Sequence, residues 1–384
     1  MKFNPASSRS TCLRNARPVV LHRHPRVVAV RPPVPRTARS PRRRGRQCCR
    51  FRCRAFRRTF QQVSLAFGTD LESAQHLNRI LRVQLPEPTI LRVDHFLSNE
   101  LVHRVIALRF LNRVFEPTWN AVHLERVDIS WLETLTLEGR ASYYDGAGAL
   151  KDMIQNHLME VMALVLMEQP ARVDRDSFRG ARVEALRAVA TPSTEQIHTR
   201  TVRARYTAGS IGSRHVPSYV DEPGVQPTRD TETYASLTLE VDSPRWKGVP
   251  VTLRSGKALA TDSAEVALHF RSVPRYLRDQ WAGVEPNVLR LGLRQPYVRL
   301  ATNLNGPDQR AETHQLDLHS AASRRSAYAN LILDILRRDP TLLIRDDEAE
   351  EAWRIVDPVM KAWSAAEVPM LQYVAGTAPG QELA

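Results

Sequence analysis

The sequence predicts an α+β fold, in which a large, mainly antiparallel sheet carries helices on one side. Segments with the 3.6-residue period of a helix occur before residue 165 and after residue 326, and strand-like segments fill the stretch from 195 to 304. Strands grouped in this way, with helices before and after them, are typical of an α+β domain. The 384 residues are 42% hydrophobic, which is enough for one large core or two smaller ones.

Five helices are expected. The first is capped by Thr69 or Asp70, and its apolar stripe ends before Pro86. The second covers roughly residues 98–112. A long, strongly periodic helix follows Gly148 and places His157 on its apolar face. The last two helices span residues 326–337 and 346–363.

One large sheet is expected from the strand-like segments. Residues 124–137 alternate between apolar and polar side chains and contain β-branched residues. Six further candidates follow. They are Gln196–Tyr206, Thr233–Val241, Val249–Ser255, Glu265–Phe270, Val288–Leu293 and Tyr297–Leu304.

The first 59 residues differ in composition from the rest of the chain. Residues 1–58 hold seventeen Arg, one Lys and no acid, which gives +18; the whole chain carries +14, so residues 59–384 carry −4. Seven prolines break helices there and no apolar period is sustained, so we expect disorder. An Arg- and Pro-rich composition of this kind is typical of a GC-rich coding region translated in the wrong reading frame. We interpret residues 1–59 in that way.

Other interpretations of this segment are weaker. A nucleic-acid-binding tail would need more aromatic side chains than Phe51 and Phe56 for base stacking. The prolines disrupt the amphipathic pattern of a transit peptide. The pair Cys49 and Cys53 is not followed by a second pair, as a zinc site would require. Residues 59–384 have no basic excess, so we do not expect nucleic-acid binding there either.

The rest of the chain has the composition of a cytoplasmic protein. All four cysteines lie in the first 59 residues, so the remainder uses neither disulfides nor Cys-ligated metals, which fits a reducing compartment. There is no run of eighteen apolar residues, so we expect no membrane-spanning helix.

Two acid/histidine centres lie about sixty residues apart. Asp94 and His95 stand in the run Arg92–Leu97 (RVDHFL), and His157 ends the run Asp152–His157 (DMIQNH). A histidine on a buried helical stripe suits a general base, and a carboxylate suits the partner that fixes its tautomer. From the residues alone, a histidine on such a stripe is more often a satisfied core residue than a catalytic base.

These runs resemble motifs of the glucose-6-phosphate dehydrogenase family. Arg92–Leu97 resembles its RIDHYLGK element, and Asp152–His157 reproduces its DMIQNH element at the same spacing. The resemblance continues from about Phe67 to Pro379. It includes Glu116–Asn120 (EPTWN), Arg205–Ala208 (RYTA), Trp246–Lys257 with its RSGK core, Asp339–Asp347, Glu350–Trp353 (EEAW) and Val356–Pro358 (VDP).

The resemblance implies roles for seven residues. His157 is the implied catalytic base, Asp94 its partner and His95 a phosphate ligand. Glu133, Asp152 and Lys257 match positions that contact the sugar phosphate. Asn99 stands where the family has a phosphate-binding lysine, which removes a charge-assisted bond. Two more departures are Phe96 in place of a tyrosine and Asp262 in place of a basic residue. If the alignment is right, Asp94 and His157 should lie within hydrogen-bond reach, roughly 2.6–3.2 Å.

The family implies NADP as coenzyme, but no complete Rossmann domain is recognisable. A dinucleotide site needs a strand, a glycine-rich turn and a helix N-terminus. Gly146-Ala147-Gly148 fails the pattern because its sixth position is Lys151, and we interpret it as a helix entry. We therefore divide the chain into four parts. They are residues 1–59, a remnant of a coenzyme domain at 60–92, a substrate and dimerisation domain at 93–379, and a tail at 380–384.

The expected function is oxidation of glucose 6-phosphate, or a related sugar phosphate, with NADP in the pentose phosphate pathway, by a homodimer that forms through the sheet. The departures at Asn99 and at the coenzyme domain lead us to expect an impaired copy. The alternative is a non-catalytic paralogue that binds a sugar phosphate or serves as a regulatory or structural subunit. Nucleic-acid binding through residues 1–58 is the weakest alternative.

Overall fold

The computed structural model describes residues 62–63, 68–94, 96–97, 100–172, 174–281, 283–305, 310–318, 326–337 and 339–378. The chain divides into two units, Met1–Arg57 and Arg58–Ala384, and all described residues belong to the second. The expected disorder of residues 1–59, and the alternatives for that segment, therefore lie outside the described residues.

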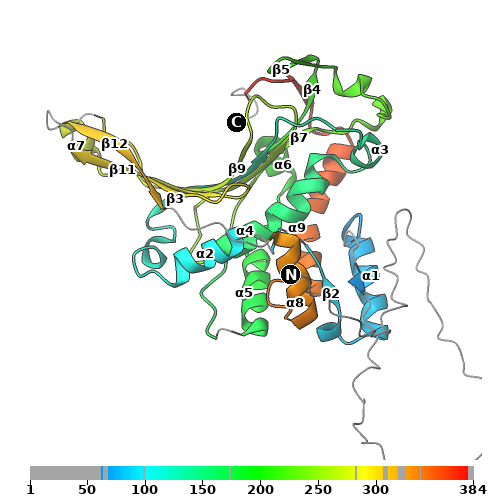
Figure 1. The fold of residues 1–384 in the computed structure, drawn as a ribbon, viewed down its shortest axis with the longest axis horizontal. Helices are drawn as coiled ribbons and strands as arrows, with labels where there is room; N and C mark the ends of the chain where they lie inside the picture. Colours follow the sequence, from blue (N-terminus) through cyan, green and yellow to red (C-terminus); the bar gives the residue numbers. More distant parts are fainter. Residues whose placement is uncertain are drawn as a thin grey trace, which may run out of the picture. The chain divides into compact units, whose positions relative to one another are not determined.

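A nine-stranded sheet is the centre of the second unit (Figure 1). Its strand order is β12-β11-β10-β9-β3-β8-β7-β4-β13, and only the pairs β3–β8 and β4–β13 are parallel among these described strands. The strands are β3 Leu124–Leu132, β4 Thr201–Thr207, β7 Tyr234–Leu239, β8 Val251–Gly256, β9 Ser263–Phe270, β10 Val288–Gly292, β11 Val298–Asn305, β12 Ala311–Leu318 and β13 Met370–Val374. Two small ribbons pair β1 Gln62–Val63 with β2 Leu91–Arg92, and β5 Gly209–Ile211 with β6 Arg214–Val216.

The main helices gather on one face of this sheet (Figure 1). The helices are α1 Leu71–Gln84, α2 Glu100–Phe110, α3 Ala141–Tyr144, α4 Met159–Leu166, α5 Arg175–Arg187, α6 Thr194–Arg200, α7 Arg275–Gln280, α8 Ala327–Arg337 and α9 Asp346–Ser364. Short 3₁₀ turns occur at Glu87–Thr89, Glu116–Thr118, Tyr219–Asp221 and Pro227–Arg229. The predicted α+β class with helices on one side of a mainly antiparallel sheet is confirmed.

The helix that was expected after Gly148 begins as a π-helix, η3 (Leu150–Leu158), and continues as α4. All eight residues of α4 are buried, so this helix runs through the centre of the core. The π-helical part, η3, packs against the strands β3, β7 and β8 and against α9, and α4 packs against α2 and α5. A π-helical stretch inside an α-helix is often found at a functional site.

Helix α1 shows how the sequence fixes local structure. Asp70 caps it by accepting a hydrogen bond from Ser73 N at 2.8 Å, and Ser73 returns a bond to the Asp70 backbone, which forms a capping box. Its buried Asn78 donates to the carbonyl of Asp346 at 3.0 Å. The helix is therefore held against α9 by a polar contact as well as by packing.

One expected strand is partly wrong. The candidate Gln196–Tyr206 begins with the helix α6, and the strand β4 starts only at Thr201. The reason is a second capping box, in which Ser193 and Gln196 satisfy each other's backbone N–H groups and start a helix. The helix α5 and the strands β12 and β13 were not predicted. No described helix is long and apolar enough to cross a membrane.

Candidate functional site

Asp94 and His157 meet where the loop after β2 approaches η3. His157 Nδ1 and Asp94 Oδ2 are 2.5 Å apart, so the expected contact is present. The other Asp94 oxygen accepts a hydrogen bond from Phe96 N at 2.8 Å, which fixes the carboxylate against its own loop. Asp94 is buried, whereas the His157 side chain keeps 15% of its surface exposed. An imidazole held in this way through Nδ1 has a fixed orientation, with its second ring nitrogen, Nε2, on the opposite edge of the ring.

The Phe96 ring stacks against one face of the His157 imidazole and so supports its orientation. Its ring stacks on His157 with centroids 4.0 Å apart and an interplanar angle of 9°. The same ring contacts Trp131 at 4.8 Å. The substitution of phenylalanine for the family's tyrosine thus retains an aromatic support for His157, although it carries no hydroxyl group.

A second cluster, the Glu133 cluster, consists of Glu133, Lys257 and Arg294. The parallel register of β3 and β8 pairs Leu132 with Gly256, so the next residues, Glu133 and Lys257, leave the sheet side by side. Lys257 Nζ lies 2.8 Å from one Glu133 oxygen, and Arg294 Nη2 lies 2.7 Å from the other. Burial acts to raise the pKa of Glu133, but Lys257 and Arg294 outweigh it, and the pKa is lowered below its ordinary value.

Arg294 was not predicted as a site residue. It lies in the turn between β10 and β11, its guanidinium covers the Trp131 ring at 4.9 Å, and its other end pairs with Asp262 at 3.0 Å. Asp262 also accepts a hydrogen bond from Thr134 N at 2.7 Å. The acid that replaces a basic family residue is therefore matched by an arginine from another strand connection. No signal along the sequence marks Arg294, because the antiparallel pairing of β10 with β9 brings it to the site.

Asp152 contacts a tyrosine next to the one that lies against Lys257. It lies on η3 and accepts a hydrogen bond from Tyr143 OH at 3.0 Å. Burial and this carboxylate together raise the pKa of Tyr143 to about 12. The neighbouring Tyr144 ring lies under the Lys257 ammonium at 5.4 Å. A series of contacts therefore connects His157, through the rings of Phe96 and Trp131, to the Glu133 cluster. Tyr144, which lies against Lys257 of this cluster, is the sequence neighbour of the tyrosine that binds Asp152.

The two predicted phosphate positions lie outside the described residues. His95 and Asn99 are therefore not placed by the structure, and their expected effect on phosphate binding stays a prediction. The structure brings together Asp94 with His157 and Glu133 with Lys257, and it places Asp152 beside the tyrosine pair.

Asp94, His157 and Glu160 form a candidate set of metal ligands, because one ligand atom from each lies within 4.8 Å of the others. A tetrahedral zinc ion bound at about 2.1 Å holds two ligand atoms roughly 3.4 Å apart. The 2.5 Å between His157 Nδ1 and Asp94 Oδ2 is instead a hydrogen-bond distance. The three residues are therefore organised by hydrogen bonding rather than as a metal centre.

The turn Gly146–Gly148 does not fit a dinucleotide. A Cβ atom on Gly148, which has φ +71°, would lie 2.3 Å from Glu232 Oε1, and that oxygen accepts a hydrogen bond from Leu150 N at 2.9 Å. The backbone N–H of Leu150 at the start of η3 is therefore already bonded to the carboxyl group of Glu232 and is not available to a pyrophosphate. This agrees with the interpretation of the turn as a helix entry.

Two family models match the chain. Residues 106–384 match the glucose-6-phosphate dehydrogenase C-terminal domain, and residues 63–104 match the NAD binding domain of the same family. The chain belongs to the glucose-6-phosphate dehydrogenase family. The match to the NAD binding domain covers a short segment, which contains α1, β2 and the beginning of α2.

Known family members agree with this assignment. The glucose-6-phosphate 1-dehydrogenase of Treponema pallidum is 39% identical over 325 residues, which are 82% of this chain and 63% of that protein. The enzyme of Zymomonas mobilis is 37% identical and is matched over 81% of this chain and 66% of its own length. The chain thus spans somewhat less than two thirds of these family members.

Solved structures of the family have the same fold. A glucose-6-phosphate dehydrogenase in complex with its substrate glucose 6-phosphate matches with a TM-score of 0.75 and 28% identity, over 83% of this chain and 66% of that one. The Mycobacterium avium enzyme matches with a TM-score of 0.71 and 35% identity, over 81% of this chain and 64% of that one.

Proposed function

We propose that the described residues form the substrate-handling part of a cytoplasmic glucose-6-phosphate 1-dehydrogenase, which oxidises glucose 6-phosphate to 6-phosphogluconolactone with NADP. The contact between Asp94 and His157 carries the proposal, because it places a carboxylate-oriented imidazole beside a cluster of charged side chains. Glucose 6-phosphate is the substrate with which one related structure was solved.

His157 takes the proton in this proposal. Oxidation at C1 of the sugar removes a proton from the C1 hydroxyl and a hydride from C1 itself. His157 Nε2 accepts the hydroxyl proton, while Asp94 holds the ring through Nδ1 and stabilises the imidazolium that forms. Phe96 blocks one face of the ring and prevents it from turning away.

The Glu133 cluster and Asp152 bind the sugar in this proposal. The carboxylates of Glu133 and Asp152 can accept hydrogen bonds from sugar hydroxyls, and both already accept them from neighbouring side chains. Lys257 supplies a mostly buried ammonium group, which suits an oxygen of the sugar phosphate. Its partner Glu133 keeps that ammonium in a fixed position before substrate arrives.

The binding of NADP is not among the steps that we assign to this chain. NADP supplies the hydride acceptor for the reaction, but the turn Gly146–Gly148 does not fit it. We therefore assign to this chain the binding of the sugar phosphate and the removal of the hydroxyl proton. The same observation favours a second candidate function, namely a non-catalytic relative that binds a sugar phosphate or pairs with an intact paralogue.

We also propose that the chain forms a homodimer through its sheet. The main helices lie on one face of the sheet (Figure 1), and we place the dimer contact on the opposite face. Three leucines of the β11–β12 hairpin, Leu304, Leu316 and Leu318, are about half exposed. Light scattering coupled to size-exclusion chromatography should give twice the chain mass of 43.6 kDa, and a mass of 43.6 kDa would contradict the dimer.

Calorimetry with the purified chain tests substrate binding. We expect glucose 6-phosphate to bind and glucose, which lacks the phosphate, to bind much more weakly. Replacement Lys257→Met should weaken glucose 6-phosphate binding about 10- to 100-fold, because it removes a charged hydrogen-bond donor worth roughly 1.5–3 kcal/mol. Lys247→Met, at an exposed lysine, is the matched control and should bind normally. Equal affinity of the two variants would contradict the assigned site.

A turnover assay separates the two candidate functions. We expect the 384-residue chain to produce negligible NADPH from glucose 6-phosphate, because the glycine turn considered for NADP, Gly146–Gly148, does not fit it. Robust NADPH production that is lost in His157→Asn but kept in His198→Asn, at an exposed histidine, would overturn this limit and establish a complete enzyme.

A further inference from the structure

Glu160 is a buried acid directly beneath the Asp94–His157 pair. It lies three residues after His157 on α4, one helical turn away, so both side chains leave the helix on the same side. Its exposure is 5%, and one of its oxygens belongs to the set of three ligand-type atoms that lie within 4.8 Å of one another. Neither the family motifs nor the proposed chemistry assigns it a role.

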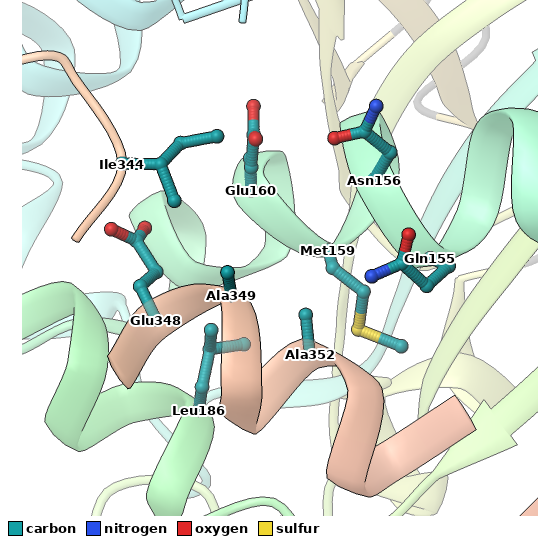
Figure 2. Close-up of a pocket in the computed structure, with 9 residues that line it drawn as sticks. All are labelled: Gln155, Asn156, Met159, Glu160, Leu186, Ile344, Glu348, Ala349 and Ala352. Carbon is teal, nitrogen blue, oxygen red and sulfur yellow. The ribbon is translucent and has the colours of Figure 1, made fainter. Parts of the chain in front are cut away.

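Glu160 borders a small cavity. Its Oε2 atom has no hydrogen-bond partner among the described residues. The cavity has a volume of about 10 Å³ and is bordered by Gln155, Asn156, Glu160, Ile344 and Glu348, among others. Figure 2 shows the carboxyl groups of Glu160 and Glu348 at the same end of it, near Ile344. A space of this size holds about one water molecule.

Among the described residues, Glu160 forms no ion pair with a cation, although Arg182 is one of its charged neighbours. Arg182, from α5, donates to Glu348 of α9 at 2.9 Å and to the backbone carbonyl of Leu343 at 2.7 Å. Asp94 is engaged by His157 and by the Phe96 backbone. Two neighbouring carboxyl groups in an apolar core do not both ionise. Burial raises the pKa of Glu160 well above its ordinary value, and the charges of Asp94 and Glu348 act in the same direction, whereas Arg182 opposes them.

We propose that Glu160 is a positioning residue that stays protonated and donates a hydrogen bond to Asp94, so that Asp94, and through it His157, is held from inside the core. Asp94 then accepts from three sides: from His157, from the Phe96 backbone and from Glu160. Glu160 also borders the water-sized cavity, and the paired Arg182 and Glu348 are among its charged neighbours.

The proposed hydrogen bond couples Glu160 to His157 through Asp94. A donor on Asp94 takes up part of the negative charge that would otherwise stabilise the imidazolium. Removal of the donor should therefore raise the His157 pKa, while loss of a negative charge at residue 160 would lower it. The role in catalysis rests on the proposed function, but the coupling to His157 is measurable without substrate or coenzyme.

Nuclear magnetic resonance titration of the full chain labelled with ¹³C-histidine tests the proposal. The His157 signal is assigned by its loss in His157→Asn. We expect Glu160→Gln, which keeps the volume and a donor, to leave the His157 pKa within about 0.3 units of the parent chain. Glu160→Met, which keeps the volume but removes the donor, should raise it by roughly 0.5–1 unit. Glu195→Gln, at an exposed acid, is the control.

Each other outcome overturns the proposal. A fall of the His157 pKa in both variants would mean that Glu160 is ionised, and no change in either would mean that it is not coupled to Asp94. If Glu160→Met does not fold, Glu160→Asn takes its place: it keeps an amide donor but is too short to reach Asp94, so it should behave as Glu160→Met. Failure of glucose 6-phosphate to bind in calorimetry would sink the proposed function and leave this coupling intact.

Discussion

Glu133 and Glu160 are both glutamates in the candidate site, and they have opposite surroundings. Glu133 stands at the end of β3, partly exposed, with Lys257 and Arg294 on its two oxygens. Glu160 is buried in α4, and its nearest charged neighbours include two other acids. Burial acts to raise the pKa of both carboxyl groups, but cations reverse the effect for Glu133 and acids reinforce it for Glu160.

The difference separates two tasks that one residue type performs. An ionised Glu133 accepts hydrogen bonds and suits the recognition of hydroxyl groups. A protonated Glu160 donates one and suits the support of another acid. Neither state follows from the amino acid itself, because each depends on the charges that other elements supply. The comparison makes three predictions about stability and pH, in order of decreasing effect.

The largest loss of stability is expected when Arg182, the buried cation that pairs with Glu348, is replaced. Arg182 is fully buried, so replacement Arg182→Met would leave Glu348 beside Glu160 without its ion-pair partner. The free energy of unfolding, measured with urea, should fall by about 3–5 kcal/mol. Arg200→Met, which breaks an exposed pair with Glu240, should cost less than about 1 kcal/mol. If the two variants lose the same stability, the buried acids do not depend on Arg182.

An intermediate effect is expected from a third acid, Glu232, at the N-terminus of η3. Burial raises its pKa from 4.5 to about 7. A carboxyl group whose pKa is raised on folding stabilises the fold below its unfolded pKa, and this contribution is lost as pH rises through the folded value. Between about pH 4.5 and 8 the parent chain should therefore lose up to roughly 3 kcal/mol that Glu232→Gln retains.

Parallel urea unfolding at pH 5, 6, 7 and 8 measures this difference. Glu195→Gln is the control, because its side chain is exposed and should follow the parent chain at each pH. A stability difference between the parent chain and Glu232→Gln that is constant across the range would show that Glu232 does not titrate there.

The smallest effect on stability is expected at the Glu133 cluster. The Arg294 side chain is 33% exposed, and Lys257 remains with Glu133 when it is removed. Arg294→Met should therefore change the free energy of unfolding by less than about 1 kcal/mol, and the change should shrink in high salt. Unfolding at low and high sodium chloride tests this. A loss as large as that of Arg182→Met would erase the contrast between the two regions.

Much of the fold was predictable because local patterns and tertiary structure agree. The capping box at Asp70 and the apolar stripe of the helix after Gly148 identify elements that the structure contains. The error at residues 196–200 arose because β-branched residues near Thr201 outweighed the cap at Ser193. The strands β12 and β13 were missed for another reason. β12 is largely exposed and is ordered by pairing with β11, and β13 pairs with β4 from a distant part of the chain.

The sequence by itself determined the Asp94–His157 pair and the candidates Asp152 and Lys257, because these residues lie in motifs whose order and spacing identify the family. The alignment between those motifs added Glu133. Only the tertiary structure decided the role of Arg294, which reaches Glu133 across 161 residues of sequence through the turn between β10 and β11. It also decided the surroundings of Glu160. The position one turn after His157 is visible in the sequence, but α5 and α9 supply Arg182 and Glu348, and the charge state of a buried acid depends on its neighbours in space.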